Sequence, residues 1–356
     1  MADTPPALQP SRPTIAVDGT ESSTLAGGLL GLRVRTDVHG LSNCEAEFGN
    51  WGPKGDASDF LFFDRQLLDF GKELKIMLGT TALFVGKITA LEARYPEGNS
   101  PSLVVLAEDR FQDLRMTRRT RSFADVSDSD VFSQIAGDHG LTPDVGVTGP
   151  TYKVLAQVNQ SDLAFMRERA RALDAELWVT DSKLSVQPRS SRGGSPVTLT
   201  YGKELREFRV LADLADQATS FEVTGWDVSG KQAVNEQADD SVVSSELKGG
   251  DSGPSILKSA FGDRKDALAN SVPQTSDEAH ARAEAVLKRR ARRFLVGHGT
   301  AETKPELQVG ATVTLAGVGP LFEGDFYLAA TEVVFDGAKG MRTELELERP
   351  GLGKAA

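Results

Sequence analysis

Histidine and serine are the residue types of this chain that could most directly support catalysis or metal binding. The histidines stand far apart and fall in different predicted elements: His39, His139, His280 and His298. None has the spacing of a metal-ligand pair, and no Gly-x-Ser-x-Gly elbow is present to expose a serine nucleophile. His139 is better interpreted as a helix-end residue and His280 as a solvated helix residue.

Two further patterns have a simpler structural interpretation. The stretch from Gly79 to Lys87 contains the glycine and lysine of a phosphate-binding loop, but the spacing is too long, and Ile88 stands where Ser or Thr would bind magnesium. A hairpin turn fits better. Asp128 and Asp130 fall at a predicted helix start, where negative charge stabilises the helix dipole without chemistry. We therefore expect no catalytic, cofactor-binding or metal-binding residue and no enzyme activity, and we assign no binding residue.

Basic residues gather in two runs. The first contains Arg115, Arg118, Arg119 and Arg121, and the second extends from Lys288 to Arg293. One hypothesis is contact with acidic neighbours in a particle or with DNA in a lumen. The simpler hypothesis, charge on a linker and on an exposed helix end near a favourable dipole, is preferred.

Composition narrows the class of protein. Forty Lys and Arg against 51 Asp and Glu give a net charge of −11, which argues against a general nucleic-acid or anionic-membrane binder. The single Cys44 excludes an intramolecular disulfide and a cysteine-built metal site, and indicates folding in a reducing cytoplasm. The N-terminus is polar and proline-rich, unlike a secretory signal, and no apolar run reaches the roughly 18 residues that span a bilayer. Exit from a cell would then need lysis or a larger particle.

The same β pattern occurs twice, over 70–110 and 309–349. Each copy opens at a glycine, alternates apolar residues, turns at Leu-Phe-x-Gly and ends in an apolar strand, which predicts a three-strand meander. The strands 31–38 and 220–228 are interpreted as a matching strand upstream of each copy. On that alignment the second copy carries an insertion of roughly 50 residues. In the second copy Glu344, Glu346 and Glu348 alternate with leucines, which predicts a wet strand face or a lumen.

Duplication predicts quasi-symmetry, because three copies of such a chain would present six similar barrels around one axis. The alternative is that two sandwich domains share a turn by chance. The equal lengths and the repeated turn favour duplication.

The middle of the chain has a different pattern. After an arginine-rich linker over 111–121, a helix capped by Asp128 or Ser129 is expected, then a second helix from 159–161 and a hairpin over 176–188. Further on, 232–253 is polar and is expected to be a mobile excursion. A capping box at Thr275 and Glu278 predicts a helix over 276–293.

The expected fold class is therefore mainly β with α+β parts. Two related tube-type β-barrel domains would flank a small α+β domain, which consists of two helices and a hairpin. The second barrel would carry a helical insertion. The expected boundaries are a flexible N-terminus over 1–12, the first barrel over 13–112, the α+β domain over 113–195, the second barrel over 196–240 and 295–350, the insertion over 241–294 with its helix over 276–293, and a tail over 351–356.

Two motifs carry a resemblance to a known family. The first consists of Gln157, Ser161, Asp162, Leu163, Phe165, Arg167, Ala175 and Trp178. The second consists of Pro305, Leu307, Val309, Gly310, Gly317, Gly319, Pro320, Leu321, Gly324 and Phe326. In this order they resemble the phage late control protein D family, which includes baseplate hub proteins of contractile tails and the hub half of VgrG spike proteins.

The resemblance implies a structural, trimeric baseplate hub of a contractile phage tail or phage-tail-like injection system. Its two barrels would form a pseudo-hexameric ring that joins the hexameric inner tube to a trimeric spike. The implied partners are the inner tail-tube protein, the spike protein and baseplate wedge components, with cargo or DNA in the lumen and no membrane insertion. Assembly would take place in the bacterial cytoplasm, and the particle would act in the cytoplasm or outside the cell.

Two departures from the family matter. Many members have a histidine before the aromatic residue of the penultimate strand, whereas here Val334 precedes Phe335, so a role attached to that histidine is missing. VgrG proteins continue into a needle, but this chain stops at Ala356, from which a separate spike polypeptide is expected.

The sequence leaves two other function classes open. A carbohydrate- or cell-surface-binding β protein would use Trp51, Trp178 and Trp226 as stacking platforms, but these lie in separate segments. A peptidoglycan hydrolase is the least favoured class, because no stretch of the sequence suggests such a domain.

Overall fold

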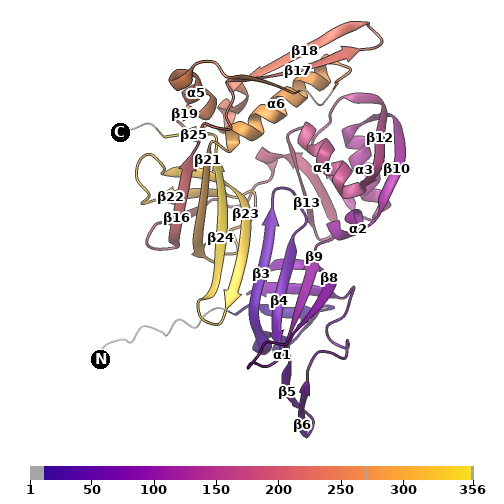
Figure 1. Cartoon of the computed structure of the whole chain (residues 1–356), viewed down its shortest axis with the longest axis vertical. Helices are drawn as coiled ribbons and strands as arrows, with labels where there is room; N and C mark the ends of the chain where they lie inside the picture. Colours follow the sequence, from indigo (N-terminus) through magenta and orange to yellow (C-terminus); the bar gives the residue numbers. More distant parts are fainter. Residues whose placement is uncertain (1–11, 269–271, 354–356) are drawn as a thin grey trace.

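The first β module is a curled antiparallel sheet around an apolar core. The computed structural model describes residues 12–268 and 272–353. Alternate residues of the strands, such as Leu32, Val34, Ala46 and Phe48, point into the core. The hairpin β5–β6 extends from this sheet, whereas the short helix α1 packs against it and contributes Leu25 to the core (Figure 1). The elements are β1 (Thr14–Val17), β2 (Thr20–Glu21), α1 (Ser23–Gly28), β3 (Leu29–Asp37), β4 (Asn43–Gly49), β5 (Trp51–Lys54), β6 (Ala57–Phe60), β7 (Glu73–Leu78), β8 (Thr81–Arg94) and β9 (Ser102–Glu108).

The second β module repeats this plan around its own core, which includes Leu199, Leu205, Val313, Phe326 and Leu345. The expected fold class, mainly β with two related barrel modules, is confirmed. The module consists of β15 (Val197–Thr200), β16 (Leu205–Ala212), β21 (Leu295–Glu302), β22 (Thr312–Ala316), β23 (Gly324–Asp336) and β24 (Gly340–Arg349). The two modules join into one sheet, in which β23 pairs with β3 (Figure 1).

The pairing registers of the two modules match at several places. The ladder β8–β9 carries a bulge at Thr89, and β23–β24 carries one at Ala329. The ladder β3–β4 is bulged at Leu30, and β16–β21 at Arg206. The amide of Gly71 donates to Ile88 O at 2.8 Å, and the amide of Gly310 donates to Leu328 O at 2.9 Å. Bulges are specific features of a ladder, so their recurrence at matching places supports duplication. One pair differs, since β1 runs antiparallel to β7 whereas β15 runs parallel to β22.

The matching strand upstream of the second copy is β16, so the alignment of 220–228 with 31–38 is wrong. Segment 220–227 forms β17, which pairs with β18 and β20 in a separate sheet covered by α6. That lobe has its own core, with Phe221, Val223, Ala283 and Leu287. The insertion therefore begins directly after β16 and ends before β21, and it is longer than roughly 50 residues. The predicted range 196–240 assigned β17 and β18 to the second barrel. This was wrong, because both strands belong to the inserted lobe.

The rest of the insertion contains more regular secondary structure than its polar sequence predicts. The stretch expected to be a mobile excursion forms β18, a 3-10 helix and β19. The helix α6 begins and ends close to the expected positions, and Thr275 caps it by accepting the amide of Glu278 at 3.2 Å. The elements are β17 (Ser220–Asp227), β18 (Gln232–Asp239), η2 (Asp240–Glu246), β19 (Asp251–Ser252), α5 (Gly253–Phe261), β20 (Lys265–Leu268) and α6 (Ser276–Arg292).

The two ends of the chain lie partly outside the described residues. The flexible segment expected over 1–12 falls there except for Arg12. The segment 351–356 was expected to be a tail, but its first residues form β25 (Gly351–Leu352), which pairs with β19.

The small α+β unit contains the two expected helices and the expected hairpin, together with three more strands, β10, β11 and β12, and a short helix. The arginine-rich stretch 111–121 is not a linker, because it forms α2 and the start of β10, which pairs with β12. Ser127 caps α3 in place of Asp128 or Ser129: its hydroxyl accepts the Asp130 amide, and the Asp130 carboxylate accepts the Ser127 amide. The elements are α2 (Phe111–Arg115), β10 (Arg118–Ser127), α3 (Asp128–Asp138), β11 (Thr142–Val145), β12 (Thr151–Ser161), α4 (Asp162–Ala172), β13 (Ala175–Thr180), β14 (Lys183–Pro188) and η1 (Arg189–Ser191).

Candidate assembly surface

The seam between the modules is formed by β3 and the C-terminal half of β23. Val34 lies opposite Val333, and Leu32 lies opposite Phe335. Phe335 is only 2% exposed and belongs to the core of the first module, although it comes from the second copy. The N-terminal half of β23 pairs with β22. The long strand β23 therefore pairs within the second module along its N-terminal half and with the first module along its C-terminal half.

An ion pair marks the outer face of this seam. Arg33 donates to Glu332 at 3.0 Å, and this hydrogen bond and charge raise the pKa of the Arg33 guanidinium. Both side chains are partly in solvent, so the pair contributes little stability. Its use is in holding the register of the two strands.

Two strand edges that correspond to this seam are open in the single chain. The C-terminal half of β8 corresponds to the part of β23 that pairs with β3, and β16 corresponds to β3. Within the described residues, β16 pairs along its length only with β21, and the C-terminal half of β8 pairs only with β9. Leu211 on β16 is 52% exposed, and Tyr95 just after β8 is 65% exposed. Open edges of this kind are templates for pairing with another chain.

The outer face of the sheet carries charged side chains. Arg94 contacts Glu45, Glu47 and Glu92 at 3.4, 3.2 and 2.8 Å, and Ser102 donates to Glu47 at 2.6 Å. In the second module Glu344 and Glu346 are half-buried on this face. Glu348, expected on the same wet face, is instead buried by Arg189 and Arg293. The expectation of an acidic wet face thus holds for the first two glutamates.

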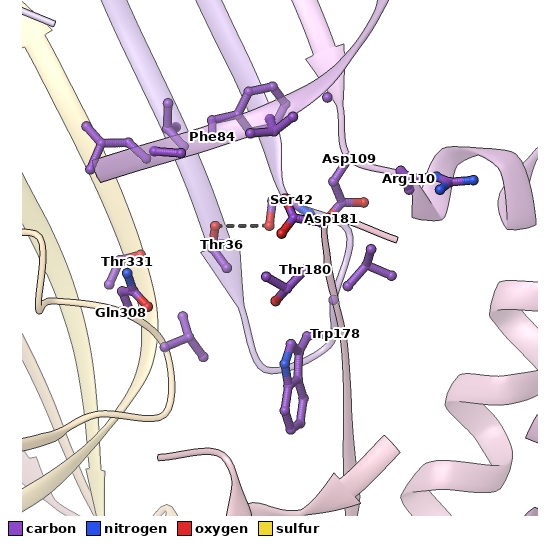
Figure 2. Close-up of a pocket in the computed structure, with 18 of the residues that line it drawn as sticks. Thr36, Ser42, Phe84, Asp109, Arg110, Trp178, Thr180, Asp181, Gln308 and Thr331 are labelled. Carbon is purple, nitrogen blue, oxygen red and sulfur yellow. Dashed lines mark hydrogen bonds between the residues drawn. The ribbon is translucent and has the colours of Figure 1, made fainter. Parts of the chain in front are cut away.

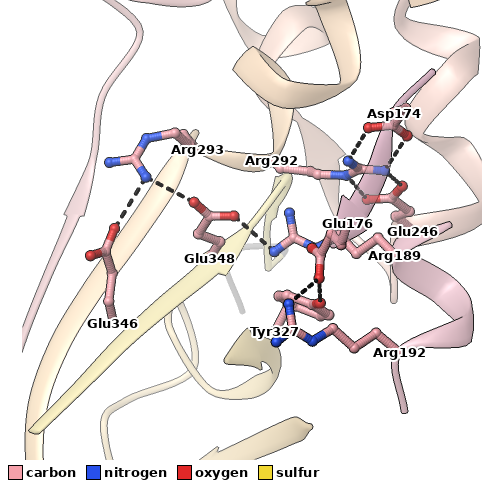
Figure 3. A network of polar contacts seen from close by, with 10 residues as sticks. All are labelled: Asp174, Glu176, Arg189, Arg192, Glu246, Arg292, Arg293, Tyr327, Glu346 and Glu348. Atoms are coloured by element: carbon pink, nitrogen blue, oxygen red, sulfur yellow. Dashed lines mark hydrogen bonds and ion pairs between the residues drawn. The ribbon is translucent and has the colours of Figure 1, made fainter. Parts of the chain in front are cut away.

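A buried arginine ties the inserted lobe to the α+β unit (Figure 3). Arg292 at the end of α6 donates to both oxygens of Asp174 at 2.5 and 2.7 Å, and to both oxygens of Glu246 at 2.8 and 2.6 Å. Burial alone would raise the pKa of Glu246, but the Arg292 guanidinium outweighs it and lowers that pKa. Such a doubly forked arrangement fixes the angle between the two units.

A second cluster ties the α+β unit to the second module (Figure 3). Glu176 accepts the Tyr327 hydroxyl at 2.6 Å and Arg192 at 3.1 Å. Arg189 stacks over the Tyr327 ring at 3.6 Å and reaches Glu348 at 2.8 Å. Burial and the adjacent Glu176 carboxylate raise the pKa of Tyr327. The phenol therefore stays protonated and donates to the carboxylate.

The basic runs contact groups of this chain. In the second run, Lys288 contacts Glu284, Arg290 contacts Asp266, and Arg293 contacts Glu346 and Glu348. Arg289 donates to the carbonyl of Arg171 at 2.7 Å. In the first run, Arg115 contacts Glu108, Arg118 donates to the carbonyl of Asn159, and Arg119 and Arg121 contact Asp162. These contacts support a role in folding over a role in DNA binding.

The family-like motif at 157–165 builds a buried carboxylate cluster. Asp162, which is 1% exposed, accepts Gln157 at 2.9 Å, Arg121 at 2.9 Å and the His139 ring at 2.8 Å. Burial opposes ionisation of Asp162, yet these donors bring its pKa below the ordinary value. Ser161 caps α4 by accepting the Ala164 amide. His139 ends α3, as expected, and lies beside Asp162. The motif therefore orders β12 and α4.

The C-terminal motif requires its glycines for backbone reasons. Gly310 has φ of +100°, and a Cβ there would lie 2.4 Å from Arg192 O. Gly324 has φ of +114° at the start of β23. Both conformations are strained for other residues. Gly310 lets its turn approach Arg192 of the α+β unit, and Gly324 lies beside Arg349 of its own module.

A cavity of about 880 Å³ lies where the two modules and the α+β unit meet (Figure 2). Its lining comes from all three, and includes Thr36, Phe84, Asp109, Trp178, Gln308 and Thr331. Arg192 covers the Trp178 ring at 4.7 Å. Trp51 lies on the hairpin β5–β6 and Trp226 lies on β17 in the inserted lobe. The three tryptophans thus form no common stacking platform.

In residues 12–268 and 272–353, no group of three or more His, Cys, Asp and Glu could hold a metal ion, and no helix is long and apolar enough to cross a membrane.

Asp109 is expected to make stability depend on pH. Burial raises its pKa to about 6, while it accepts the amides of Ser42 at 2.7 Å and Phe111 at 2.9 Å. The folded state holds this proton more tightly, so the contribution is fully present below about pH 4 and is lost as pH rises through 6. Relative to Asp109→Asn, the wild type should lose about 2 kcal/mol of unfolding free energy between about pH 4 and pH 8. Urea unfolding at both pH values measures this, and a pH-independent difference would contradict it.

A family model described as the Alg8 N-terminal domain matches residues 10–334. No curated protein matches the sequence. A prophage MuSo2 43 kDa tail protein from Shewanella oneidensis superposes with a TM-score of 0.71 and 14% identity, covering 95% of this chain and 98% of that chain. A tail protein from Neisseria meningitidis gives 0.65 and 12%, covering 96% and 97%.

A third solved structure comes from a secretion system. It is an Escherichia coli component of the type VI secretion system, described as similar to T4 bacteriophage tail proteins, and it gives a TM-score of 0.56 at 11% identity, covering 96% of this chain and 79% of that chain. At these identities the likeness establishes the fold, which is that of phage tail proteins.

Proposed function

We propose that this chain, which belongs to the Alg8 N-terminal domain family, is a structural subunit of a contractile phage tail or a related injection particle. The observation that carries the proposal is the duplicated module with one seam made and the matching edges left open. The tail-protein fold along almost the whole chain supports it. The family description names a domain and no activity.

The subunit acts as a trimeric symmetry adaptor in this proposal. Three chains joined through their open edges would place six nearly equivalent modules around one axis. One face of the ring could then meet a hexameric inner tube, while the three α+β units and inserted lobes could meet a trimeric spike. The resemblance of the motifs at 157–178 and 305–326 to the late control protein D family supports these two partners. Wedge proteins of the baseplate and cargo or DNA in the lumen complete the proposed set.

The proposed mechanism is assembly without substrate turnover. The His139 ring contacts the buried Asp162 carboxylate at 2.8 Å, a pair of residue types that also occurs in catalytic dyads. Asp162 also accepts Gln157, Arg119 and Arg121. These contacts give it a structural use, in ordering β12 and α4. The chain is expected to assemble in the bacterial cytoplasm and to act within the particle.

The test is the mass of the purified chain in solution, alone and mixed with candidate tube and spike proteins from the same genome. Light scattering coupled to size exclusion is expected to give three times the mass of the chain. Electron micrographs of the particle should then show this ring between tube and spike. A monomer under all of these conditions would sink the proposal.

A further inference from the structure

We propose that the C-terminal half of β8 pairs antiparallel with β16 of a second copy of this chain, with Glu92 opposite Leu211 of the partner subunit. The inference rests on the proposed function, because it names the contact that closes the ring. It follows from the seam already present within the chain. There, β23 pairs with β3, and these two strands are the copies of β8 and β16.

The register is obtained by counting from the shared bulges. Glu332 lies three residues after the bulged Ala329, and Glu92 lies three residues after the bulged Thr89. Arg35 lies five residues after the bulged Leu30, and the partner's Leu211 lies five residues after that strand's bulge. Since Glu332 lies opposite Arg35 in the seam, Glu92 should lie opposite the partner's Leu211.

The two residues of the seam's ion pair have charged counterparts at these edges. Arg33, which bonds Glu332, corresponds to Arg209 by the same count. Arg209 is exposed, and no ion pair of Arg209 occurs among the described residues. Glu92 is also exposed and contacts Arg94 at 2.8 Å. An ion pair between Glu92 and Arg209 of the partner subunit would reproduce the Arg33–Glu332 contact.

The apolar side of the seam recurs as well. Phe335 and Tyr95 each lie six residues after the bulge of their strand, but Phe335 is 2% exposed and Tyr95 is 65% exposed. Opposite Phe335 lies Leu32, whose counterpart Phe208 is half-buried at the side of the second core. Tyr95 is placed to cover that core in a neighbour. Phe60 and Phe63 already pack against its ring, with centroids 6.4 and 6.2 Å away.

The experiment is disulfide trapping in the full chain. Glu92→Cys with Leu211→Cys should form a ladder under oxidation that stops at a covalent trimer. Arg35→Cys with Glu332→Cys has the same geometry within one chain, so it shows that the position can close a disulfide. Glu92→Cys with Arg209→Cys shifts the pair by two residues, beyond the reach of a disulfide, and should not crosslink. Native Cys44 is 1% exposed and stays out of these reactions.

A charge reversal tests the same contact without cysteine. Glu92→Arg or Arg209→Glu alone should weaken trimer formation at least about tenfold in sedimentation, and the two together should restore most of it. If the wild type is a trimer and the Arg35/Glu332 control crosslinks while Glu92/Leu211 does not, the pairing is overturned and the proposed function stands. If the wild type is a monomer at every soluble concentration, with and without tube and spike proteins, both fail.

Discussion

Replacing Phe335 with alanine should lower the free energy of unfolding by about 3–5 kcal/mol. The ring is almost fully buried in the core of the first module, although β23 belongs to the second. Its removal leaves a cavity that the surrounding strands cannot easily fill. Chemical denaturation of the purified chain measures the loss, and both modules should unfold together because the seam joins their cores.

Tyr95→Ala is the matched control, because it removes an aromatic ring from the corresponding position of the first copy. Tyr95 is mostly exposed in the single chain, so its removal should change the unfolding free energy of the monomer much less. It should weaken self-association instead. A loss below about 1 kcal/mol for Phe335→Ala would mean that β23 does not complete the first core.

Asp128→Asn should be about as damaging, at about 3–5 kcal/mol, because it leaves a buried arginine without its counter-charge. Arg169 donates to the two Asp128 oxygens at 2.6 and 3.0 Å, and Asp128 is 0% exposed. Burial opposes the charge of Arg169, but the contacts with Asp128 and Tyr152 outweigh it and raise the Arg169 pKa. The thermal midpoint and urea unfolding would report the loss.

An exposed pair serves as the control for this effect. Asp125 contacts Lys153 at 3.2 Å with both side chains largely in solvent, so Asp125→Asn should leave the midpoint nearly unchanged. Replacing both Asp128 and Arg169 by apolar residues of similar volume should recover much of the stability. Equal midpoints for Asp128→Asn and the wild type would show that Arg169 finds another partner or reaches water.

Local patterns in the sequence predicted the repeat, the three main helices and the hairpin over 176–188. They could do so because alternation, capping residues and turns are encoded by near neighbours. The strand 220–228 was misassigned for the same reason. Its alternation equals that of a barrel strand, and only the pairing partner distinguishes β17 from β16.

Contacts between distant segments account for what could not be predicted. The polar stretch 232–253 is ordered by β17 and by β25 near the end of the chain. The stretch 111–121 becomes a strand because β12 pairs with it. The candidate surface was missed at the residue level, since Glu92, Tyr95 and Arg209 have no signal of their own. They stand out only when the shared bulges align the two modules.

The inserted lobe has a further consequence for a closed assembly. It replaces the short turn between β3 and β4 with a large appendage between β16 and β21, and it does so in one module only. Around a ring of three chains, appendages would therefore stand at every second position, with bare turns between them. The face that carries these appendages would have threefold symmetry only. A partner that docks on it could therefore bind in three equivalent orientations and not in six.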